Sequence, residues 1–280
     1  MNKISIQIDA DVKRALLEDV GTGDVTAELL PPNLQVRAEI ISREPMLVCG
    51  QAWVNEVFKQ LDDQIKLEWG VAEGVWLDKP SVLCTLHGPG RSILTGERTA
   101  LNFLQTLSAT ASQTYHYVQK LRGTQTRILD TRKTIPGLRA AQKYAVTCGG
   151  GLNHRMGLYD AVLIKENHIA ACGSVGKAVA LARQNHKNIL VEVEVETLEE
   201  LHEALAAQPD RIMLDNFSEE MLEKAVKMNQ PKRCTLEVSG GITLENIAAI
   251  GQLGVDFISV GAITKSIQAI DLSLLIRKIL

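Results

Sequence analysis

Hydrophobic and polar positions follow one pattern in the first part of the chain and another in the rest. Apolar and polar side chains alternate, as they do along half-buried strands, in residues 36–43, 65–69 and 82–87. Apolar residues recur at helical spacing in residues 9–18, 53–61 and 93–121, the last with an expected break at 108–112. These elements predict a small α/β sandwich with antiparallel strands over residues 1–110.

From about residue 123, short apolar runs alternate with helical segments. The expected strand cores are 127–129, 161–164, 189–195, 211–214, 235–238 and 257–260. The expected helices between them are 139–147, 175–184, 198–207, 219–228 and 244–252. Repeated strand and helix units predict a parallel sheet, and no Gly-x-Gly-x-x-Gly follows the first strand. We therefore predict an incomplete (β/α) barrel over residues 111–266, followed by a helix over 267–280 able to pack back on the N-terminal domain.

The composition is that of a globular protein with a sizeable core, with 280 residues of which 45% are apolar and 22% charged. The first twenty residues contain no continuous apolar stretch, and no run approaches the ~18 apolar residues that span a bilayer. We therefore expect a cytoplasmic protein without a membrane partner. The five cysteines are scattered and contain no Cys-x-x-Cys pair, so reduced structural thiols are expected rather than a disulfide framework or a zinc site.

Positive charge is concentrated between residues 120 and 165. This window has nine lysines or arginines against Asp130 and Asp160, a net +7 in a chain whose formal charge is −3. Such a local excess favours a partner that presents several negative charges at one place. The acidic overall balance and the 4% aromatic content disfavour a general nucleic-acid binder. An RNA-binding patch is nevertheless the non-enzymatic alternative for this window.

Polar side chains stand at the carboxyl ends of nearly all the expected barrel strands. In a (β/α) barrel these ends converge on one site. The charged and hydroxyl residues of this kind are Thr131, Arg132, Lys133, Lys165, Glu194 and Asp215. Glu194 and Asp215 offer the oxygen ligands that Mg²⁺ takes together with a substrate phosphate, which predicts a magnesium site. Glu192 and Glu196 share the face of Glu194, and for them a solvated edge strand and a functional role are equally open.

Glycine-rich turns offer a second kind of anion site. The turns after the last two expected strands consist of Ser239, Gly240, Gly241, Val260, Gly261 and Ala262. Backbone N–H groups at this place commonly bind phosphate in barrels, although simple strand termination is the alternative. A further glycine run at 149–151 precedes His154 and Arg155, whose donors suit a carboxylate. His168, in an Asn-His pair, is equally consistent with a loop cap.

Arg98 stands among leucines at helical spacing. It lies four residues after Leu94 and three before Leu101, so all three are expected on one face of the helix. An arginine in such an apolar stripe is seldom buried without a partner. Arg98 is therefore expected either to pair with an acid within the fold or to reach an anionic site.

Taken together, these segments closely resemble the quinolinate phosphoribosyltransferases, the carboxylating nicotinate-nucleotide pyrophosphorylases, which are type II phosphoribosyltransferases. The resemblance covers nearly the whole chain, and DTRKT followed by GGGLNHR is highly specific. The matching stretches are EDVGTGDVT (18–26), GERTALNFLQTLS (96–108), DTRKTIPGLR (130–139), GGGLNHRMGLYDAVLIKENHI (149–169), VEVEVET (191–197), IMLDN (212–216), SGGI (239–242) and SVGAIT (259–264). Glu166 stands where the family usually has Asp.

The resemblance implies that quinolinate and phosphoribosyl pyrophosphate react to nicotinate mononucleotide, pyrophosphate and carbon dioxide, with Mg²⁺ as cofactor. It implies a cationic lining around the pyridine dicarboxylate and nearby phosphates, made of Arg132, Lys133, His154, Arg155 and Lys165. Glu194 and Asp215 would serve the metal and the ribose, and the two glycine-rich turns would hold the 5′-phosphate. Arg98 would reach the site of a neighbouring subunit, which makes a homodimer obligatory and leaves further assembly open.

The expected catalytic residues are Lys133, Lys165, Glu194 and Asp215. We expect the two lysines to assist pyrophosphate departure and charge balance rather than to form a Schiff base. Two other enzymes are open from the residues alone. One is a nicotinate phosphoribosyltransferase, which makes the same bond without decarboxylation. The other is a phosphate-binding barrel lyase or aldolase with Lys133 or Lys165 as an imine-forming amine.

Overall fold

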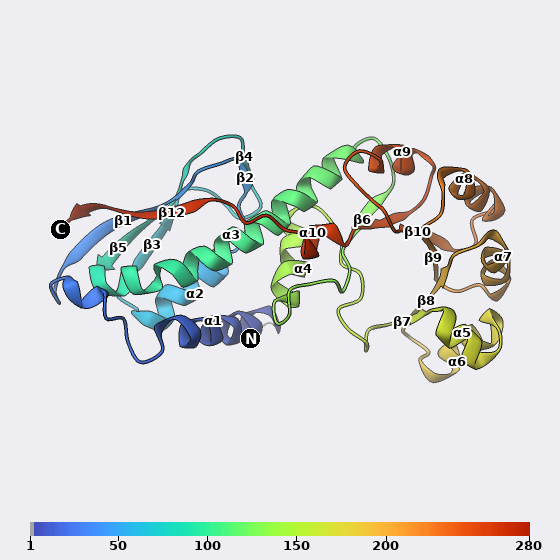
Figure 1. Cartoon of the computed structure of the whole chain (residues 1–280), viewed down its shortest axis with the longest axis horizontal. Helices are drawn as coiled ribbons and strands as arrows, with labels where there is room; N and C mark the ends of the chain where they lie inside the picture. Colours follow the sequence, from blue (N-terminus) through green and yellow to red (C-terminus); the bar gives the residue numbers. More distant parts are fainter. Residues whose placement is uncertain (1–2) are drawn as a thin grey trace. The chain divides into compact units, whose positions relative to one another are not determined.

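The computed structural model of the chain describes residues 3–280 (Figure 1). These residues form two compact units. The first comprises the described residues up to Tyr115 together with Thr134–Gly149 and Ile263–Leu280. The second comprises His116–Lys133 and Gly150–Ala262. The chain therefore leaves the first unit and re-enters it twice.

The first unit is built on a four-stranded antiparallel sheet in the order β12-β1-β5-β3. Its strands are β1 (Gln35–Ser42), β3 (Lys66–Trp69), β5 (Val82–Pro89) and β12 (Leu272–Ile279). Its other elements are α1 (Lys3–Val20), the 3₁₀ turn Ala27–Leu29, α2 (Gln51–Leu61), α3 (Gly90–Lys120), α4 (Arg139–Cys148) and the short pair β2 (Met46–Leu47) and β4 (Trp76–Leu77). Alternate residues of β1 and apolar residues of α2 and α3 share one core, as the period-two and helical patterns predicted.

The final segment is a strand, and the helix that we predicted for residues 267–280 was wrong. β12 pairs with β1 in antiparallel register, with Leu274 opposite Ile40. Leu272 and Leu274 are buried while Ser273 between them is only partly buried, so the short apolar run suits a strand as well as a helix. The edge of β1 offers a ladder of backbone hydrogen bonds, and pairing there decides the outcome. The segment does return to the first unit.

Helix α3 runs without interruption through residues 108–112, where we predicted a break. That prediction was wrong because the two serine hydroxyls in this stretch have partners outside the helix. Ser108 Oγ accepts the backbone N–H of Cys49 and donates to its carbonyl, both at 3.0 Å. Ser112 Oγ accepts the N–H of the last residue of β2 at 2.7 Å. These bonds tie α3 to its neighbours and leave its own backbone ladder intact.

The second unit contains a six-stranded parallel sheet in the order β6-β11-β10-β9-β8-β7. The strands are β6 (Arg127–Leu129), β7 (Ala161–Ile164), β8 (Leu190–Val195), β9 (Arg211–Asp215), β10 (Thr235–Ser239) and β11 (Phe257–Ser259). β6 and β7 follow one another in sequence but lie at opposite ends of the sheet. The barrel is therefore incomplete, as predicted, because a closed barrel requires its two end strands to pair.

Helices connect the parallel strands, and each of them except α5 was expected from the sequence. They are α5 (Glu166–Cys172), α6 (Val175–Asn185), α7 (Leu198–Ala207), α8 (Glu219–Met228) and α9 (Ile247–Gln252). Ser174, Thr197 and Ser218 begin three of them, each accepting a backbone N–H of the first turn through its hydroxyl. Each helix in the described part of the chain falls short of the length or the apolar character that a membrane span requires.

Parallel pairing brings the carboxyl ends of the strands to one edge of the sheet. Asp215 at the end of β9 is opposite Ser239 at the end of β10. Leu129 at the end of β6 is opposite Ser259 at the end of β11. The residues that follow each strand, such as Asp130, therefore begin their loops at this common edge.

Gly149, the residue after α4, packs so closely on α3 that a side chain has no room. A Cβ there would lie 2.5 Å from the carbonyl oxygen of Ala111 and 2.6 Å from Thr114 Cβ. We predict that Gly149→Ala lowers the free energy of unfolding by about 1 to 3 kcal/mol through overpacking, measured by urea denaturation. Gly176→Ala in α6 is the matched control, since an added Cβ meets no atom of the described residues within 4 Å. Equal losses in the two variants would contradict the packing argument.

Candidate active site

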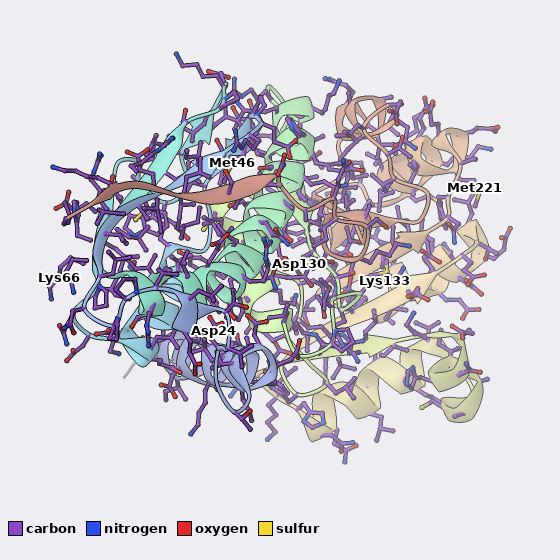
Figure 2. The ribbon with its side chains drawn as sticks, turned by 60° about the vertical axis from the view of Figure 1, so that its left-hand side comes forward. Asp24, Met46, Lys66, Asp130, Lys133 and Met221 are labelled. Atoms are coloured by element: carbon purple, nitrogen blue, oxygen red, sulfur yellow. The ribbon has the colours of Figure 1, made fainter. Side chains whose placement is uncertain are left out.

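The carboxyl edge of the parallel sheet holds a cavity of about 310 Å³. Its lining residues all belong to the second unit. They are Thr131, Arg132, Lys133, His154, Arg155, Leu163, Lys165, Glu194, Met213, Asp215, Glu237, Ser239 and Ser259. The structure thus brings the predicted cations, the predicted carboxylates and one serine of the glycine-rich turns to a single place. Asp130 and Lys133, labelled in Figure 2, mark the segment that follows β6.

The arginines of the cavity have N–H donors that are available to a ligand. Arg132 Nε is buried and has no hydrogen-bond partner among the described residues, which costs free energy unless a ligand supplies an acceptor. Arg155 Nη1 donates to the carbonyl of Ala161 at 3.5 Å. Burial lowers the pKa of Arg155 and the charge of Arg132 lowers it further, while nearby carboxylates oppose the shift. Two guanidinium groups in one pocket therefore favour an anionic ligand.

Lys165 and Glu194 form an ion pair in the cavity wall. Lys165 Nζ lies 2.5 Å from Glu194 Oε2, and the glutamate side chain is 10% exposed. A carboxylate oxygen of Glu194 also lies within 4.8 Å of those of Glu196 and Asp215. Three carboxylates that are partly open to solvent match the oxygen ligands that Mg²⁺ takes beside a phosphate. Glu196, which the sequence left open, therefore joins the candidate ligands.

His154 is oriented by protein groups at both of its ring nitrogens. Nδ1 accepts the backbone N–H of Arg155 at 2.7 Å, so the proton of the ring is on Nε2. Nε2 lies 2.9 Å from Glu192 Oε2 and 3.6 Å from Glu237 Oε2. The backbone N–H of His154 donates to Asp130 Oδ1 at 2.9 Å. The ring therefore forms part of the cavity wall in a fixed orientation.

Two fully buried glutamates lie next to His154. Glu192 on β8 and Glu237 on β10 have no exposed surface, and Arg211 Nη1 donates to Glu237 Oε2 at 2.9 Å. Burial raises the pKa of each glutamate to about 7, and repulsion from Glu192 adds to the shift at Glu237. Burial therefore favours the protonated form of both carboxyl groups over the charged form. Glu192 is not on a solvated edge strand, because β8 lies between β7 and β9.

Glu237, Arg211 and Asp130 are the parts of the site that the sequence analysis missed. Glu237 interrupts the apolar core of β10, and a carboxylate in a strand buried on both faces needs a cationic or protonated partner. Arg211 supplies that cation, and its guanidinium also lies 4.3 Å from the centre of the Phe257 ring. A charged residue inside an apolar run was the available signal. The identity of its partner could not be read from the sequence, because Arg211 comes from the preceding strand.

The two glycine-rich turns lie beside the cavity, and glycine is required in each of them for a different steric reason. Gly240 and Gly241 have positive φ angles of 92° and 61°. A Cβ at Gly240 would lie 2.1 Å from Asn216 Oδ1, and both glycines line a neighbouring cavity of about 250 Å³. A Cβ at Gly261 would lie 3.1 Å from Lys133 Cδ. The absence of a side chain at 261 therefore allows Lys133 to pack against the backbone of the last turn.

The other residues singled out in the sequence lie outside the cavity lining of the described chain. Arg98 is exposed on α3 in the first unit, whereas Leu94 is half-buried and Leu101 is buried. Val260 is buried, its N–H donates to a carbonyl of β6, and the following helix α10 spans Ala262–Lys265. His168 caps α5 by accepting the N–H of the preceding N-cap residue on Nδ1 at 3.0 Å, which confirms the loop-cap interpretation.

A cationic cavity opposed by carboxylates, at the carboxyl edge of an incomplete (β/α) barrel, defines a barrel protein with a site for polyanionic ligands. Comparison with known families gives the particular class. Residues 24–108 match the family model described as quinolinate phosphoribosyl transferase, N-terminal domain, and residues 110–275 match that of its C-terminal domain. The chain belongs to the quinolinate phosphoribosyltransferase family.

Individual relatives match over almost their whole length. The solved structure of the nicotinate-nucleotide pyrophosphorylase from Francisella tularensis is 50% identical, with a TM-score of 0.95 over 98% of this chain and 97% of that chain. The probable nicotinate-nucleotide pyrophosphorylase (carboxylating) of Bacillus subtilis is 42% identical over 96% of this chain and 93% of its own. The corresponding Mycobacterium leprae protein is 41% identical over 94% and 95%. The fold class and the family predicted from the sequence are confirmed.

The buried glutamate pair predicts a particular pH dependence of stability. Folding raises the pKa of Glu237 from 4.5 to about 7, so its contribution is fully present below pH 4.5 and is lost as the pH rises through 7. We predict that Glu237→Gln, which cannot ionise, loses less free energy of unfolding than the wild type between about pH 5 and about pH 8. The difference should be on the order of 1 to 3 kcal/mol, measured by urea denaturation.

The exposed Glu203→Gln on α7 is the control for removing a carboxylate at the surface. It should follow the wild-type pH profile. If Glu237→Gln and the wild type lost stability in parallel over this range, the pKa of Glu237 would not be raised by burial.

Proposed function

We propose that the protein transfers the phosphoribosyl group of phosphoribosyl pyrophosphate to quinolinate with decarboxylation, giving nicotinate mononucleotide, pyrophosphate and carbon dioxide for NAD biosynthesis. One observation carries this proposal, the presence around one cavity of Arg132, Lys133, Arg155 and Lys165 together with Glu194 and Asp215. Membership of the family supports the same reaction. The relatives from Bacillus subtilis and Mycobacterium leprae are named as carboxylating enzymes, which favours this reaction over a nicotinate phosphoribosyltransferase.

The charges of the cavity suit two substrates that repel each other. Quinolinate has two carboxylates and phosphoribosyl pyrophosphate has two phosphorylated positions, so binding both requires a dense cationic lining. Arginine offers a fork of donors that matches a carboxylate, and the buried Nε of Arg132 has no acceptor among the residues that the structure describes. We assign the dicarboxylate to Arg132 and Arg155, with the imidazole of His154 beside them. We assign the pyrophosphate to Lys133 and Lys165.

The reaction needs no electron sink beyond the substrate itself. Loss of pyrophosphate leaves positive charge at the anomeric carbon, which Glu194 and Asp215 would stabilise electrostatically. The ring nitrogen of quinolinate attacks that carbon and becomes a pyridinium. The positive nitrogen then stabilises the electron pair that stays on C2 when the adjacent 2-carboxylate departs as carbon dioxide, and a proton taken up at C2 completes nicotinate mononucleotide.

The position of Lys165 favours charge balance over imine formation. Its Nζ is held in an ion pair 2.5 Å from Glu194 Oε2, whereas an imine-forming lysine must direct its nitrogen at a substrate carbonyl. The ion pair therefore supports Lys165, together with Lys133, as a group that stabilises the departing pyrophosphate. It counts against the aldolase alternative.

We propose Mg²⁺ as the cofactor, held by Glu194 and Asp215 with Glu196 beside them. Carboxylate oxygens of these three residues lie within 4.8 Å of one another, and their partial exposure leaves room for water and substrate oxygens. When bound, the ion supplies positive charge to the pyrophosphate group and helps to orient it.

We further propose a cytoplasmic homodimer in which Arg98 of one subunit completes the active site of the other, with assembly beyond the dimer left open. The exposure of Arg98 on α3 supports this role, because the side chain is accessible to an anion or a second subunit. All five cysteines are free thiols, which suits a reducing compartment.

Replacement of Arg132 tests the proposed reaction. The wild type, incubated with quinolinate, phosphoribosyl pyrophosphate and Mg²⁺, is expected to release carbon dioxide and mononucleotide in equal amounts. We predict that Arg132→Ala lowers kcat/KM for quinolinate by about 100-fold, because charge-assisted hydrogen bonds to a buried carboxylate are lost. Labelled substrate gives both products in one assay.

Arg122→Ala is the matched control, since Arg122 is an exposed residue of the same basic window and does not line the cavity. It should retain wild-type turnover. Wild-type turnover of nicotinic acid in place of quinolinate would favour the nicotinate phosphoribosyltransferase alternative. A wild type that is inactive with both acids would refute the proposed function.

A subunit-mixing experiment tests Arg98. If Arg98 acts across the dimer, Arg98→Ala and Arg132→Ala homodimers are both impaired, but a mixed dimer has one site with both arginines intact. We predict that mixing the two variants equally, with subunit exchange, restores about one quarter of wild-type activity, because about half of the dimers are mixed. Activity that stays at the level of the separate variants after confirmed exchange would place Arg98 outside the partner's site.

A further inference from the structure

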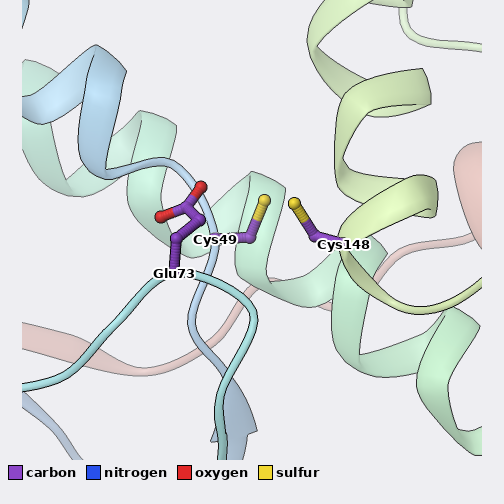
Figure 3. Close-up of side chains that lie close together, drawn as sticks. All are labelled: Cys49, Glu73 and Cys148. Carbon is purple, nitrogen blue, oxygen red and sulfur yellow. The ribbon is translucent and has the colours of Figure 1, made fainter.

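The first unit contains a second group of reactive side chains, formed by Cys49, Glu73 and Cys148. One ligand-type atom from each lies within 4.8 Å of the other two. Figure 3 shows the two sulfur atoms directed toward one another, with the carboxylate of Glu73 on the Cys49 side. All three residues belong to the first unit, and none of them lines the cavity at the strand ends.

Helix α3 holds the backbones of both cysteines. Cys49 exchanges two hydrogen bonds of 3.0 Å with the hydroxyl of Ser108. Gly149, which follows Cys148, packs so closely on α3 that a Cβ would lie 2.5 Å from the carbonyl oxygen of Ala111. The two contact points on α3 are three residues apart, which is just under one helical turn. One rigid helix therefore fixes the separation of the two cysteine backbones.

The hydrogen bonds of Glu73 show that its carboxylate already has a structural role. Glu73 accepts the backbone N–H of Gly50 at 2.8 Å and that of Gln51 at 3.1 Å, where α2 begins. It also accepts the hydroxyl of Tyr144 at 3.2 Å. This carboxylate caps a helix. The two thiols without it fall short of the four ligands of a structural zinc site.

The two thiols differ in accessibility and in acidity. Cys148 is partly exposed at the end of α4, and Cys49 is buried. A hydrogen bond from Cys49 lowers the pKa of the Cys148 thiol. Burial raises the pKa of Cys49 well above its ordinary value. Cys148 is therefore the thiol suited to attack an oxidant, and Cys49 is suited to react with it in a second step.

We propose that Cys148 and Cys49 form a reversible thiol–disulfide site whose oxidising co-substrate is a hydroperoxide. The Cys148 thiolate attacks one oxygen of the O–O bond, which breaks and leaves a sulfenic acid and an alcohol or water. The sulfur of Cys49 then attacks the sulfenic sulfur, its proton leaves with the hydroxyl group as water, and the S–S bond forms. Two thiols lose two electrons and two protons, and the peroxide is reduced.

The disulfide would join the residue before the N-cap of α2 to the last residue of α4. It would close a loop from residue 49 to residue 148, which restricts the unfolded chain and stabilises the folded one. Residues 149–151 continue from Cys148 directly to the segment that contains His154 and Arg155. In the oxidised form, the end of α4 is therefore held more rigidly, immediately before a loop of the candidate active site.

Peptide mapping of the wild-type protein tests the proposal without reference to enzyme activity. The protein is treated with hydrogen peroxide in about equimolar amount, free thiols are alkylated, and the non-reduced digest is analysed by mass spectrometry. We expect a Cys49–Cys148 disulfide, loss of two of the five alkylatable thiols, and full recovery with dithiothreitol. The oxidised protein should have a Tm higher by about 5 °C.

Two variants separate the roles of the thiols, and a third serves as control. Cys49→Ser should leave a sulfenic acid on Cys148 that dimedone traps, whereas Cys148→Ser should lose no thiols. Cys234→Ser, which removes a buried cysteine of the second unit, should form the disulfide as the wild type does.

Persistence of all five free thiols in the peroxide-treated wild type would overturn the proposal, whether or not the variants fold. Equally, one equivalent of zinc in the purified wild type that protects both thiols would show a metal site instead. Both results leave the phosphoribosyl transfer untouched, because it is assayed separately.

Discussion

Repulsion between like charges is the constraint on which the active-site region depends. The carboxyl edge of the parallel sheet collects arginines and lysines close together, and burial together with the charge of Arg132 lowers the pKa of Arg155. Beside them lie two buried glutamates whose pKa values burial raises. Buried groups of one sign are costly unless groups of the other sign are held close in good geometry. The sheet provides that geometry because its strands are rigid and in fixed register.

His154 connects the two sets of charges. Its backbone N–H bonds Asp130 and its Nδ1 accepts from Arg155, while Nε2 faces Glu192 and Glu237. The cationic wall and the buried glutamates therefore cannot move independently. The charged groups of this site are therefore in place before a ligand binds. Little protein reorganisation is then needed when they stabilise a reacting polyanion electrostatically. Within residues 3–280, the buried Nε of Arg132 has no acceptor, so this donor is in place for a ligand before the ligand binds.

The order of segments along the chain links the two units. The cationic segment before residue 134 and the segment with His154 both belong to the second unit, but α4 between them belongs to the first. α4 is held in the first unit by Gly149 against α3, and the Cys49–Cys148 pair lies at the same end of this helix. The loop that contains Arg132 and Lys133 therefore leads into α4, and the loop that contains Arg155 leads out of it. Both loops are thus connected to a helix of the first unit.

The sequence by itself determined the strand and helix repeat, the open parallel barrel and the family, because periodicity and turn residues are local properties that neighbouring residues specify. It also identified the cations and carboxylates at the strand ends, since parallel strands present these ends at one edge. Only the tertiary structure decided that residues 272–279 form a strand on β1, because a short apolar run fits either period until an edge is available. In the same way, the pairing of Glu237 with Arg211 and the proximity of Cys49 to Cys148 required coordinates. Each joins residues that are far apart in the sequence, and contacts of that kind are set by packing, which no local pattern encodes.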